Sequence, residues 1–165
     1  MADKGLLDGK RILIVDDEPD LLDTLEDLLN MCRTEKATNF EQASTLLETQ
    51  DFDIAILDIM GVDGYRLLQI AKDKNVIPVM LTAHALSPEH AVKSFKNGAA
   101  SYVPKDEITR IAVFLNDILE AKAQGKHPWW RWLERFGDFF ARRFGPDWQK
   151  RDDEFWENIA RLGPY

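Results

Sequence analysis

The stretch Arg11-Ile12-Leu13-Ile14-Val15-Asp16-Asp17 decides the fold, because an apolar run rich in β-branched residues ends directly in two carboxylates. The pattern returns at Asp53-Ile54-Ala55-Ile56-Leu57-Asp58, and a third apolar run, Ile77-Pro78-Val79-Met80-Leu81, is followed by Thr82. Short, continuous apolar runs of this kind are typical of strands that are buried on both faces. The sequence therefore predicts a sheet with parallel strands at its centre.

Segments with helical spacing of apolar residues separate these strands. The expected helices are residues 19–30, a short helix that follows Asn39 as its N-cap, a helix after Gly64, and residues 88–96 and 108–119, with weaker strands at 33–38 and 101–103. Alternating strands and helices predict an α/β fold: a five-stranded parallel sheet, doubly wound, with helices on both faces. Ligands of such sheets bind at the carboxyl ends of the strands.

Polar residues stand at each of these strand ends. Asp16 and Asp17 follow the first strand, Asp58 follows the third, Thr82 the fourth and Lys105 the fifth. Converging carboxylates raise one another's pKa unless a cation lies among them, and Mg²⁺ prefers carboxylate oxygens, water and phosphate. A lysine and a threonine hydroxyl suit phosphoryl oxygens, and a carboxylate can accept a phosphoryl group as a nucleophile. The pattern predicts an aspartyl-phosphate switch with Mg²⁺ as its cofactor.

Residues 10–120 resemble a receiver domain of the bacterial two-component response regulators, of the chemotaxis-regulator type. The stretches that carry the resemblance are Ile14-Val15-Asp16-Asp17-Glu18-Pro19, Ile56-Leu57-Asp58-Ile59-Met60, Val79-Met80-Leu81-Thr82-Ala83 and Ser101-Tyr102-Val103-Pro104-Lys105. The family implies a flavodoxin-like sheet with strand order 2-1-3-4-5. It also implies a sensor histidine kinase or a phosphotransfer protein as the phosphoryl donor.

The resemblance assigns the metal site to four residues. It implies Asp58 as phosphoacceptor and metal contact, and Asp17 as a direct metal ligand. Asp16 would act on the metal largely through water, and the backbone carbonyl of Met60 would be a further contact. No site for an organic cofactor is expected.

The resemblance also implies how the phosphoryl group is held and sensed. Thr82 would bond a phosphoryl oxygen and move on phosphorylation, and Lys105 would pair with the phosphoryl group. Tyr102 falls where the family keeps an aromatic residue that rotates with the switch.

The sequence departs from the family pattern beside the site. The loop between Asp58 and Gly64 is about two residues short and lacks its usual proline, and Lys105 precedes Asp106 instead of a proline. A trans bond is expected at Lys105–Asp106, because a cis bond before a non-proline residue costs about 2.5–4 kcal/mol. The family positions that flank the hydrolytic water are Met60 and His84 here. Since Met60 offers no hydrogen bond to that water, slow self-dephosphorylation is expected.

The composition changes after residue 122. Residues 1–120 carry a net charge of −10 and residues 121–165 one of +2, and all five tryptophans and five of the nine phenylalanines lie in the latter. We interpret residues 8–122 as the receiver domain and 126–165 as an aromatic-rich helical hairpin, with Pro128 at its start and Gly145-Pro146 at its turn. Aromatic residues recur at steps of three and four residues, which predicts one wide apolar helix face.

Three fates are open to this aromatic face. It packs onto the body or its own partner helix, it forms a homodimer or binds another protein, or it lies on a membrane surface. Glu134 and Asp138 argue against the membrane. The overall net charge of −8 argues against nucleic acid as a partner.

Other sequence features indicate the cellular location. The single cysteine, Cys32, allows no internal disulfide, so a reducing compartment is expected. No apolar run approaches the roughly 20 residues of a membrane-spanning helix, and residues 1–10 do not resemble a signal peptide. A cytoplasmic protein is expected.

Three functions compete at this point. The first is a phosphorylation-dependent switch of protein–protein interactions, which catalyses only its own phosphotransfer and dephosphorylation. The second is a degenerate receiver that acts as a constitutive interaction or dimerisation module. The third is an aspartyl-nucleophile phosphatase, which is less favoured because it needs a general acid two residues after its nucleophile, where this chain has Met60.

Overall fold

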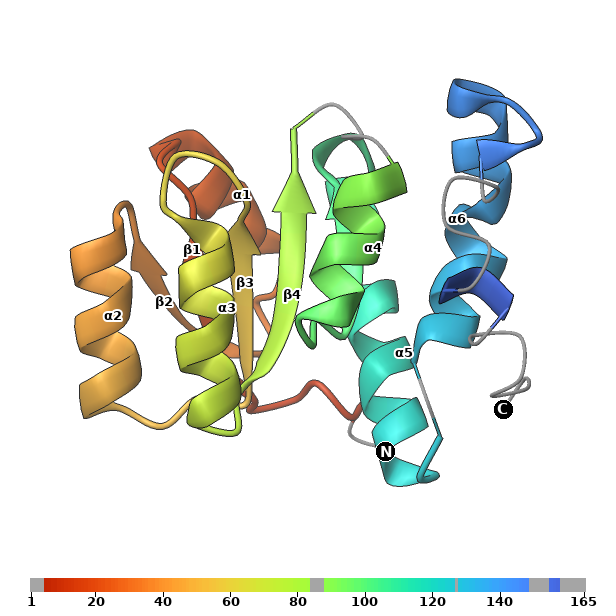
Figure 1. Cartoon of the computed structure of the whole chain (residues 1–165). Coiled ribbons are helices and arrows are strands. Elements are labelled where there is room, and N and C mark those ends of the chain that lie inside the picture. The colour runs from red at the N-terminus through yellow and green to blue at the C-terminus, as the bar shows by residue number, and fades with distance from the viewer. Residues whose placement is uncertain (1–4, 84–87, 127, 149–154, 158–165) are drawn as a thin grey trace.

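A computed structural model describes residues 5–83, 88–126, 128–148 and 155–157, without the side chains of residues 130, 139 and 143. Five parallel strands form one sheet in the order β2-β1-β3-β4-β5 (Figure 1). Their bounds are β1 Arg11–Val15, β2 Arg33–Ala37, β3 Ile54–Asp58, β4 Ile77–Thr82 and β5 Ser101–Pro104. The predicted α/β fold and strand order are confirmed.

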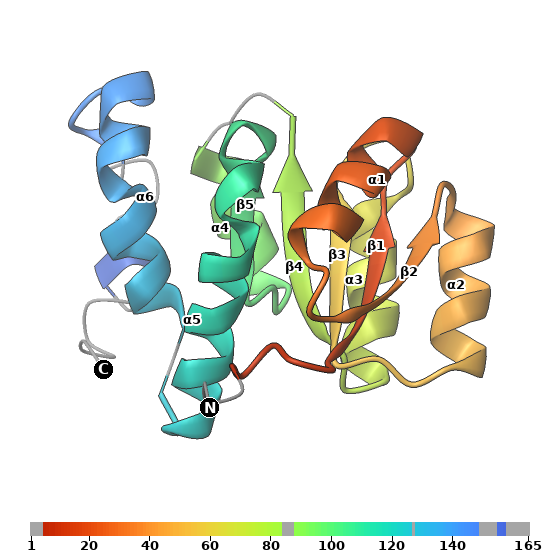
Figure 2. The same cartoon turned by 180° about the vertical axis from the view of Figure 1, so that it is seen from behind.

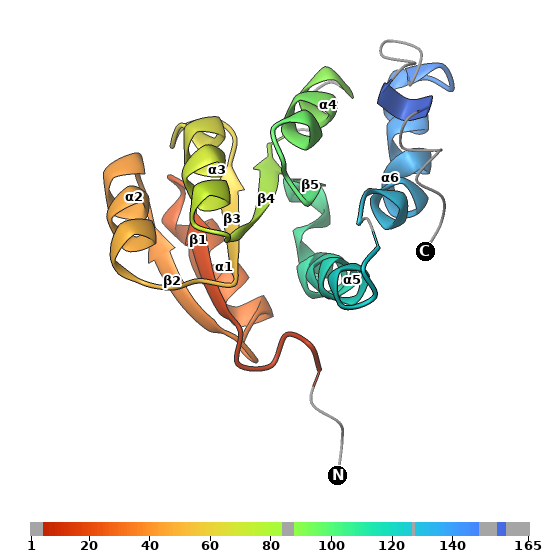
Figure 3. The same cartoon turned by 60° about the horizontal axis from the view of Figure 1, so that its bottom comes forward.

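Helices cover both faces of the sheet. One face carries α2 (Phe40–Thr49), α3 (Gly64–Asp73) and α4 (Pro88–Lys96), and the other carries α1 (Pro19–Leu28) and α5 (Ile111–Ala123) (Figures 1 and 2). Figure 3 shows the sheet between these two layers. As predicted, the Asn39 side chain caps α2 by accepting a hydrogen bond from the Gln42 N–H at 2.8 Å.

The start of α5 corrects one prediction. A 3₁₀ helix, η1 (Lys105–Arg110), precedes it, so α5 begins at Ile111 although the apolar spacing placed Ile108 in the same α-helix. Residues three apart lie on the same side of a 3₁₀ turn, and they also lie on nearly the same side of an α-helix. The spacing from Ile108 to Ile111 therefore does not distinguish the two.

The central strands form the core, and their register aligns the site. Every residue of β3 is buried, as are all but the first of β1 and of β4. Val15 of β1 pairs with Leu57 of β3, and Asp58 pairs with Leu81 of β4. The residues at the carboxyl ends of these strands are therefore held on one side of the molecule.

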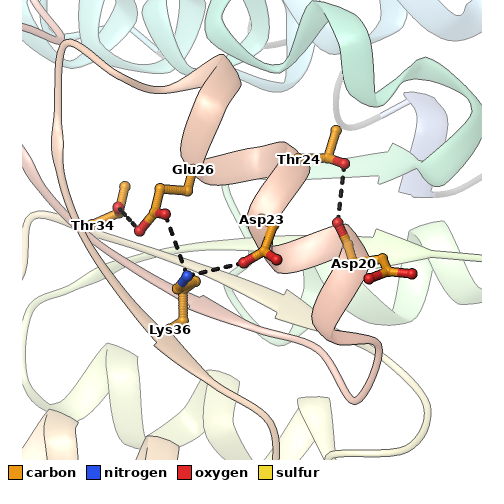
Figure 4. A network of polar contacts seen from close by, with 6 residues as sticks. All are labelled: Asp20, Asp23, Thr24, Glu26, Thr34 and Lys36. Atoms are coloured by element: carbon orange, nitrogen blue, oxygen red, sulfur yellow. Dashed lines mark hydrogen bonds and ion pairs between the residues drawn. The ribbon is translucent and has the colours of Figure 1, made fainter.

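The edge strand β2 is protected by charge. Lys36 forms ion pairs with Asp23 of α1 at 3.0 Å and with Glu26 at 3.3 Å, and the Thr34 hydroxyl lies 3.4 Å from Glu26 (Figure 4). These groups are solvated, so the network contributes little to stability. A charged lysine on an edge strand does oppose pairing with another chain.

The opposite edge, β5, is protected by a helix. All four of its residues are buried, and α6 (Trp129–Phe144) lies beside it, between α4 and α5 (Figure 3). The apolar face of α6 buries Trp132, Phe136 and Phe140. Of the three fates considered for the aromatic face, packing onto the body is the one that the structure shows for α6.

The bounds of α6 agree with its sequence signals. It begins after Pro128 and ends at Gly145, whose φ is 92°. Of the second helix expected in the hairpin, the structure describes a helical stretch at 155–157, in which Phe155 and Trp156 are buried. The rest of that expected helix lies outside the described residues. None of the helices described is long and apolar enough to cross a membrane.

Candidate functional site

The site is built at the carboxyl ends of three neighbouring strands. Asp16 directly follows β1, Asp58 is the last residue of β3, and Thr82 is the last residue of β4. All three side chains are buried, and carboxylates such as Asp16 and Asp58 are seldom buried unless they are paired. The sequence predicted these positions correctly, because each directly ends an apolar run.

Lys105 joins these strand ends by ion pairs. It begins η1 directly after β5, and its Nζ lies 2.7 Å from Asp16 Oδ2, 3.5 Å from Asp58 Oδ1 and 3.8 Å from Glu18 Oε1. The peptide bond that follows it is trans, as predicted. One ammonium group therefore forms ion pairs with carboxylates at the ends of both β1 and β3.

The carboxylates outnumber this cation, and their pKa values reflect it. Burial, and then the charges of Asp16 and Asp17, raise the pKa of Asp58 to about 6, against the opposing effect of Lys105. Burial also raises the pKa of Asp16, although Lys105 and the Glu18 N–H donate hydrogen bonds to it. Burial alone would lower the pKa of Lys105, but its hydrogen bond to Asp16 and the nearby carboxylates raise it. The site is one that a further cation would stabilise.

Three adjacent carboxylates could hold that cation. One oxygen each from Asp16, Asp17 and Glu18 lies within 4.8 Å of the others. Asp16 Oδ1 accepts a hydrogen bond from the Glu18 N–H at 2.9 Å, which folds the chain back after β1. An all-oxygen donor set of this charge fits Mg²⁺. Glu18 was not among the predicted ligands, and its adjacency to Asp16-Asp17 was the only signal in the sequence.

The short loop after β3 closes against this cluster. At Gly61 φ is +87°, and an added Cβ would lie 2.6 Å from Asp17 Oδ2. At Gly64 an added Cβ would lie 2.1 Å from the Asp58 carbonyl oxygen. Only glycine permits such close approach. Met60, on the same loop, exposes 65% of its surface.

Thr82 and Tyr102 lie on the neighbouring strands β4 and β5. Tyr102 lies on β5, is fully buried, and pairs in register with Met80 of β4, two residues before Thr82. Burial raises its pKa well above the ordinary value for tyrosine. The two residues that the resemblance assigned to the switch thus lie on the same face of adjacent strands. His84 lies outside the described residues.

Comparisons with known proteins place this geometry in a family. The model of the response regulator receiver domain matches residues 12–113. The heme response regulator HssR of Staphylococcus epidermidis is 42% identical over 99 residues, which cover 56% of this chain and 43% of HssR. The two-component response regulator ARR10 of Arabidopsis thaliana is 36% identical over 105 residues, 59% of this chain and 19% of ARR10. The chain thus spans less than half the length of these relatives.

Solved structures with the same fold are similar over the same region. A putative response regulator from Chloroflexus aurantiacus is 26% identical with a TM-score of 0.61, over 68% of this chain and 98% of that one. A CheY-like receiver domain protein from Methanospirillum hungatei is 28% identical with a TM-score of 0.58, over 69% of this chain and 98% of that one. The family model ends at residue 113, before α6 begins.

Proposed function

The chain belongs to the response regulator receiver family, and from this we propose that it is a phosphorylation-dependent signalling switch with Asp58 as phosphoacceptor. Response regulators generally interact with histidine kinases or phosphotransfer proteins, and a protein of one of these classes is the proposed donor. The observation that carries the proposal is Lys105, whose ammonium lies 2.7 Å from Asp16 and 3.5 Å from Asp58 at the end of the sheet.

Asp58 is suited to be the nucleophile. With a pKa of about 6 it is largely ionised at pH 7, yet it is more basic than an ordinary aspartate. One of its carboxylate oxygens forms a bond to phosphorus while the phosphorus–nitrogen bond of a donor phosphohistidine breaks. The electron pair of that bond stays with the imidazole, and the product is an acyl phosphate on Asp58.

Three side chains hold the new phosphoryl group and its charge. Lys105 leaves part of its ion pairing with Asp58 to pair with a phosphoryl oxygen, and the Thr82 hydroxyl donates a hydrogen bond to another. Asp16, Asp17, Asp58 and the Met60 carbonyl would hold Mg²⁺, with Glu18 as an additional carboxylate within reach. When bound, Mg²⁺ supplies positive charge that offsets the repulsion between carboxylates and phosphoryl oxygens.

The output we propose is a change of protein–protein interactions through the C-terminal helices, either with another protein or as a homodimer. The chain would catalyse only its own phosphotransfer and dephosphorylation, and act on no separate substrate. Nucleic acid is not among the proposed partners, because the chain is acidic overall.

Intact-protein mass after incubation with acetyl phosphate and Mg²⁺ tests the proposal. We expect one added phosphoryl group in the wild type and none in Asp58→Asn. The matched control is Asp51→Asn, an exposed carboxylate that precedes the opposite end of β3, which should still be phosphorylated. If the wild type gains no group and does not bind beryllofluoride, the chain is a degenerate receiver and a constitutive interaction module.

A further inference from the structure

A cavity of about 310 Å³ lies between α4 and the C-terminal extension (residues 126–165), and none of its described lining residues belongs to the phosphoacceptor site. Its lining includes Pro88 and Val92 of α4 and Trp148 and Trp156 of the extension, all of them buried. Sites for small molecules usually have volumes of about 300–1,000 Å³ and a mostly apolar lining. The cavity therefore has the size and the lining of a small-molecule site.

The two tryptophans form an angled aromatic wall. Their ring centroids lie 4.9 Å apart, and the ring planes are inclined by 74°. Trp156 stacks on Trp132 of α6 with centroids 5.9 Å apart, and Trp148 packs on Phe140 of α6 at 5.1 Å. Aromatic rings pack well on other rings in offset-stacked or edge-to-face arrangements. A planar aromatic molecule is therefore suited to this wall.

The helix that supports this wall is fixed to the body. The indole Nε1 of Trp129 donates a hydrogen bond to the Ala99 carbonyl at 2.9 Å, and that of Trp132 donates to the Tyr102 carbonyl at 2.6 Å. Carbonyl groups at the edge of a sheet need a partner from outside the sheet. Because these bonds position α6 against β5, the cavity is formed before any ligand binds.

Positive charge lies at the mouth of the cavity. Lys93 and Lys96 of α4 line it with exposed side chains, three positions apart and so on one side of the helix. Their ammonium groups lie 4.2 Å and 5.8 Å from the ring centroids of Tyr65 and Phe155. A ring attracts an ammonium group but carries no net charge to neutralise it. Glu89 is the one carboxylate among the described lining residues, so two lysines and one glutamate leave a net charge of +1.

We propose that this cavity binds a small aromatic carboxylate, with its ring between α4 and the two tryptophans and its carboxylate toward Lys93 and Lys96. A planar apolar body with one anionic group is complementary to the apolar interior and the cationic mouth. An aromatic amine would instead meet two ammonium groups and one carboxylate. A polyanion would find only two lysines on a chain of net charge −8. The proposal does not depend on the phosphorylation of Asp58.

Such a ligand would contact the body and the extension at once. A molecule that binds only the docked arrangement stabilises that arrangement by mass action. The chain would thus respond to a small molecule at a site other than the one that receives the phosphoryl group. The extension supplies the aromatic wall of this second site, and α4 supplies the charge.

Three probes with the same ring system test the charge of the ligand. They are 2-naphthoate, its neutral amide and the cationic 2-naphthylmethylamine, titrated by calorimetry into the full chain at low ionic strength. We expect 2-naphthoate to bind with a dissociation constant below about 1 mM. The amide should bind about five- to twentyfold more weakly, and the amine more weakly still.

Charge variants test the part of the two lysines. The double variant Lys93→Gln/Lys96→Gln should bind 2-naphthoate about five- to twentyfold more weakly and the amide within about twofold of the wild type. The matched control is Lys126→Gln, which removes an exposed lysine between α5 and α6 and should change neither affinity by more than about twofold. Circular dichroism checks that the variants, which change only exposed side chains, remain folded.

The indole N–H signals in ¹H–¹⁵N spectra locate the ligand. Each signal is assigned by a single Trp→Phe substitution, and 2-naphthoate should shift those of Trp148 and Trp156 most. No binding of 2-naphthoate, equal affinities for the three probes, an equal loss in Lys126→Gln, or larger shifts at other indoles would each overturn the proposal. Phosphorylation of Asp58 is measured separately by mass, so none of these outcomes affects the function proposed above.

Discussion

Asp58 carries a charge that the folded chain tolerates poorly. It is 4% exposed, and its pKa of about 6 lies above the ordinary value of 3.8. Between these pH values the unfolded chain releases a proton that the folded chain keeps, so stability falls as pH rises from about 4 to about 6 and stays lower above that. Asp58→Asn removes this loss of stability, because asparagine does not ionise. Without Mg²⁺ at pH 7 the substitution should raise the free energy of unfolding by about 1–3 kcal/mol.

Urea unfolding of both proteins in EDTA, from pH 4 to pH 7.5, measures this difference. It should grow with pH and level off above about pH 6. The control is Asp51→Asn, whose carboxylate is exposed. Mg²⁺ should stabilise the wild type more than Asp58→Asn, because a ligand stabilises the state that binds it better. A difference that is the same at every pH would contradict the assignment.

Alanine substitutions at Gly61 and Gly9 distinguish the effect of backbone strain from the effect of a displaced Asp17 on the metal site. Both have positive φ, +87° and +76°, but only an added Cβ at Gly61 would meet Asp17, at 2.6 Å from Oδ2. Each alanine substitution should cost about 1–3 kcal/mol of stability through backbone strain. Gly61→Ala alone should also weaken Mg²⁺ binding, by about tenfold, because Asp17 must move. Calorimetric Mg²⁺ titration of the two variants checks this, and equal affinities would contradict it.

The site residues differ in how far the sequence determines them. Asp58 and Thr82 were predictable because each ends an apolar run, and parallel strands bring their carboxyl ends together. Glu18 was missed because its carboxylate joins the cluster only through the turn that the Asp16 hydrogen bond forms. The contact of Trp132 with Tyr102 depends on the position of α6 along β5, which no local pattern specifies.

The ion pair between α5 and α6 should contribute more than an exposed pair between two helices. Asp117 and Arg135 have side chains 10% and 25% exposed, whereas Lys74 and Glu48, which also pair, are 42% and 54% exposed. Arg135→Gln should destabilise the chain by about 2–3 kcal/mol, because it leaves a buried carboxylate without its charged partner. Lys74→Gln should cost less than about 0.5 kcal/mol. Double-mutant cycles by urea unfolding measure both couplings, and similar values would contradict the prediction.

The elements differ in predictability for a related reason. The strands β1, β3 and β4 are buried on both faces, so their sequences are nearly all apolar. Helix α6 was predicted with its bounds, since Pro128 and Gly145 mark its ends. The 3₁₀ turn before α5 was missed, because it differs from an α-helix in hydrogen bonding and hardly in the spacing of apolar residues.

The two edges of the sheet explain why the C-terminal extension belongs to the fold. The β2 edge carries charged side chains, and β5 is buried along its whole length. An extension of about 40 residues is too short to form a stable core of its own. Its aromatic face and the β5 edge that it covers therefore stabilise each other. The change of composition near residue 122 is a boundary in the sequence but not in the fold.

If the extension is part of the fold, it should unfold together with the body. All five tryptophans lie at residue 129 or later, so tryptophan fluorescence reports on the extension, whereas far-ultraviolet circular dichroism reports mostly on the body. The two urea transitions should coincide, as they do for a single cooperative unit. Phe136→Ala should lower both midpoints together and cost about 3–5 kcal/mol, because Phe136 packs on Phe114 of α5. A fluorescence transition at lower urea than the circular dichroism transition would show that α6 undocks before the body unfolds, and it would contradict the prediction.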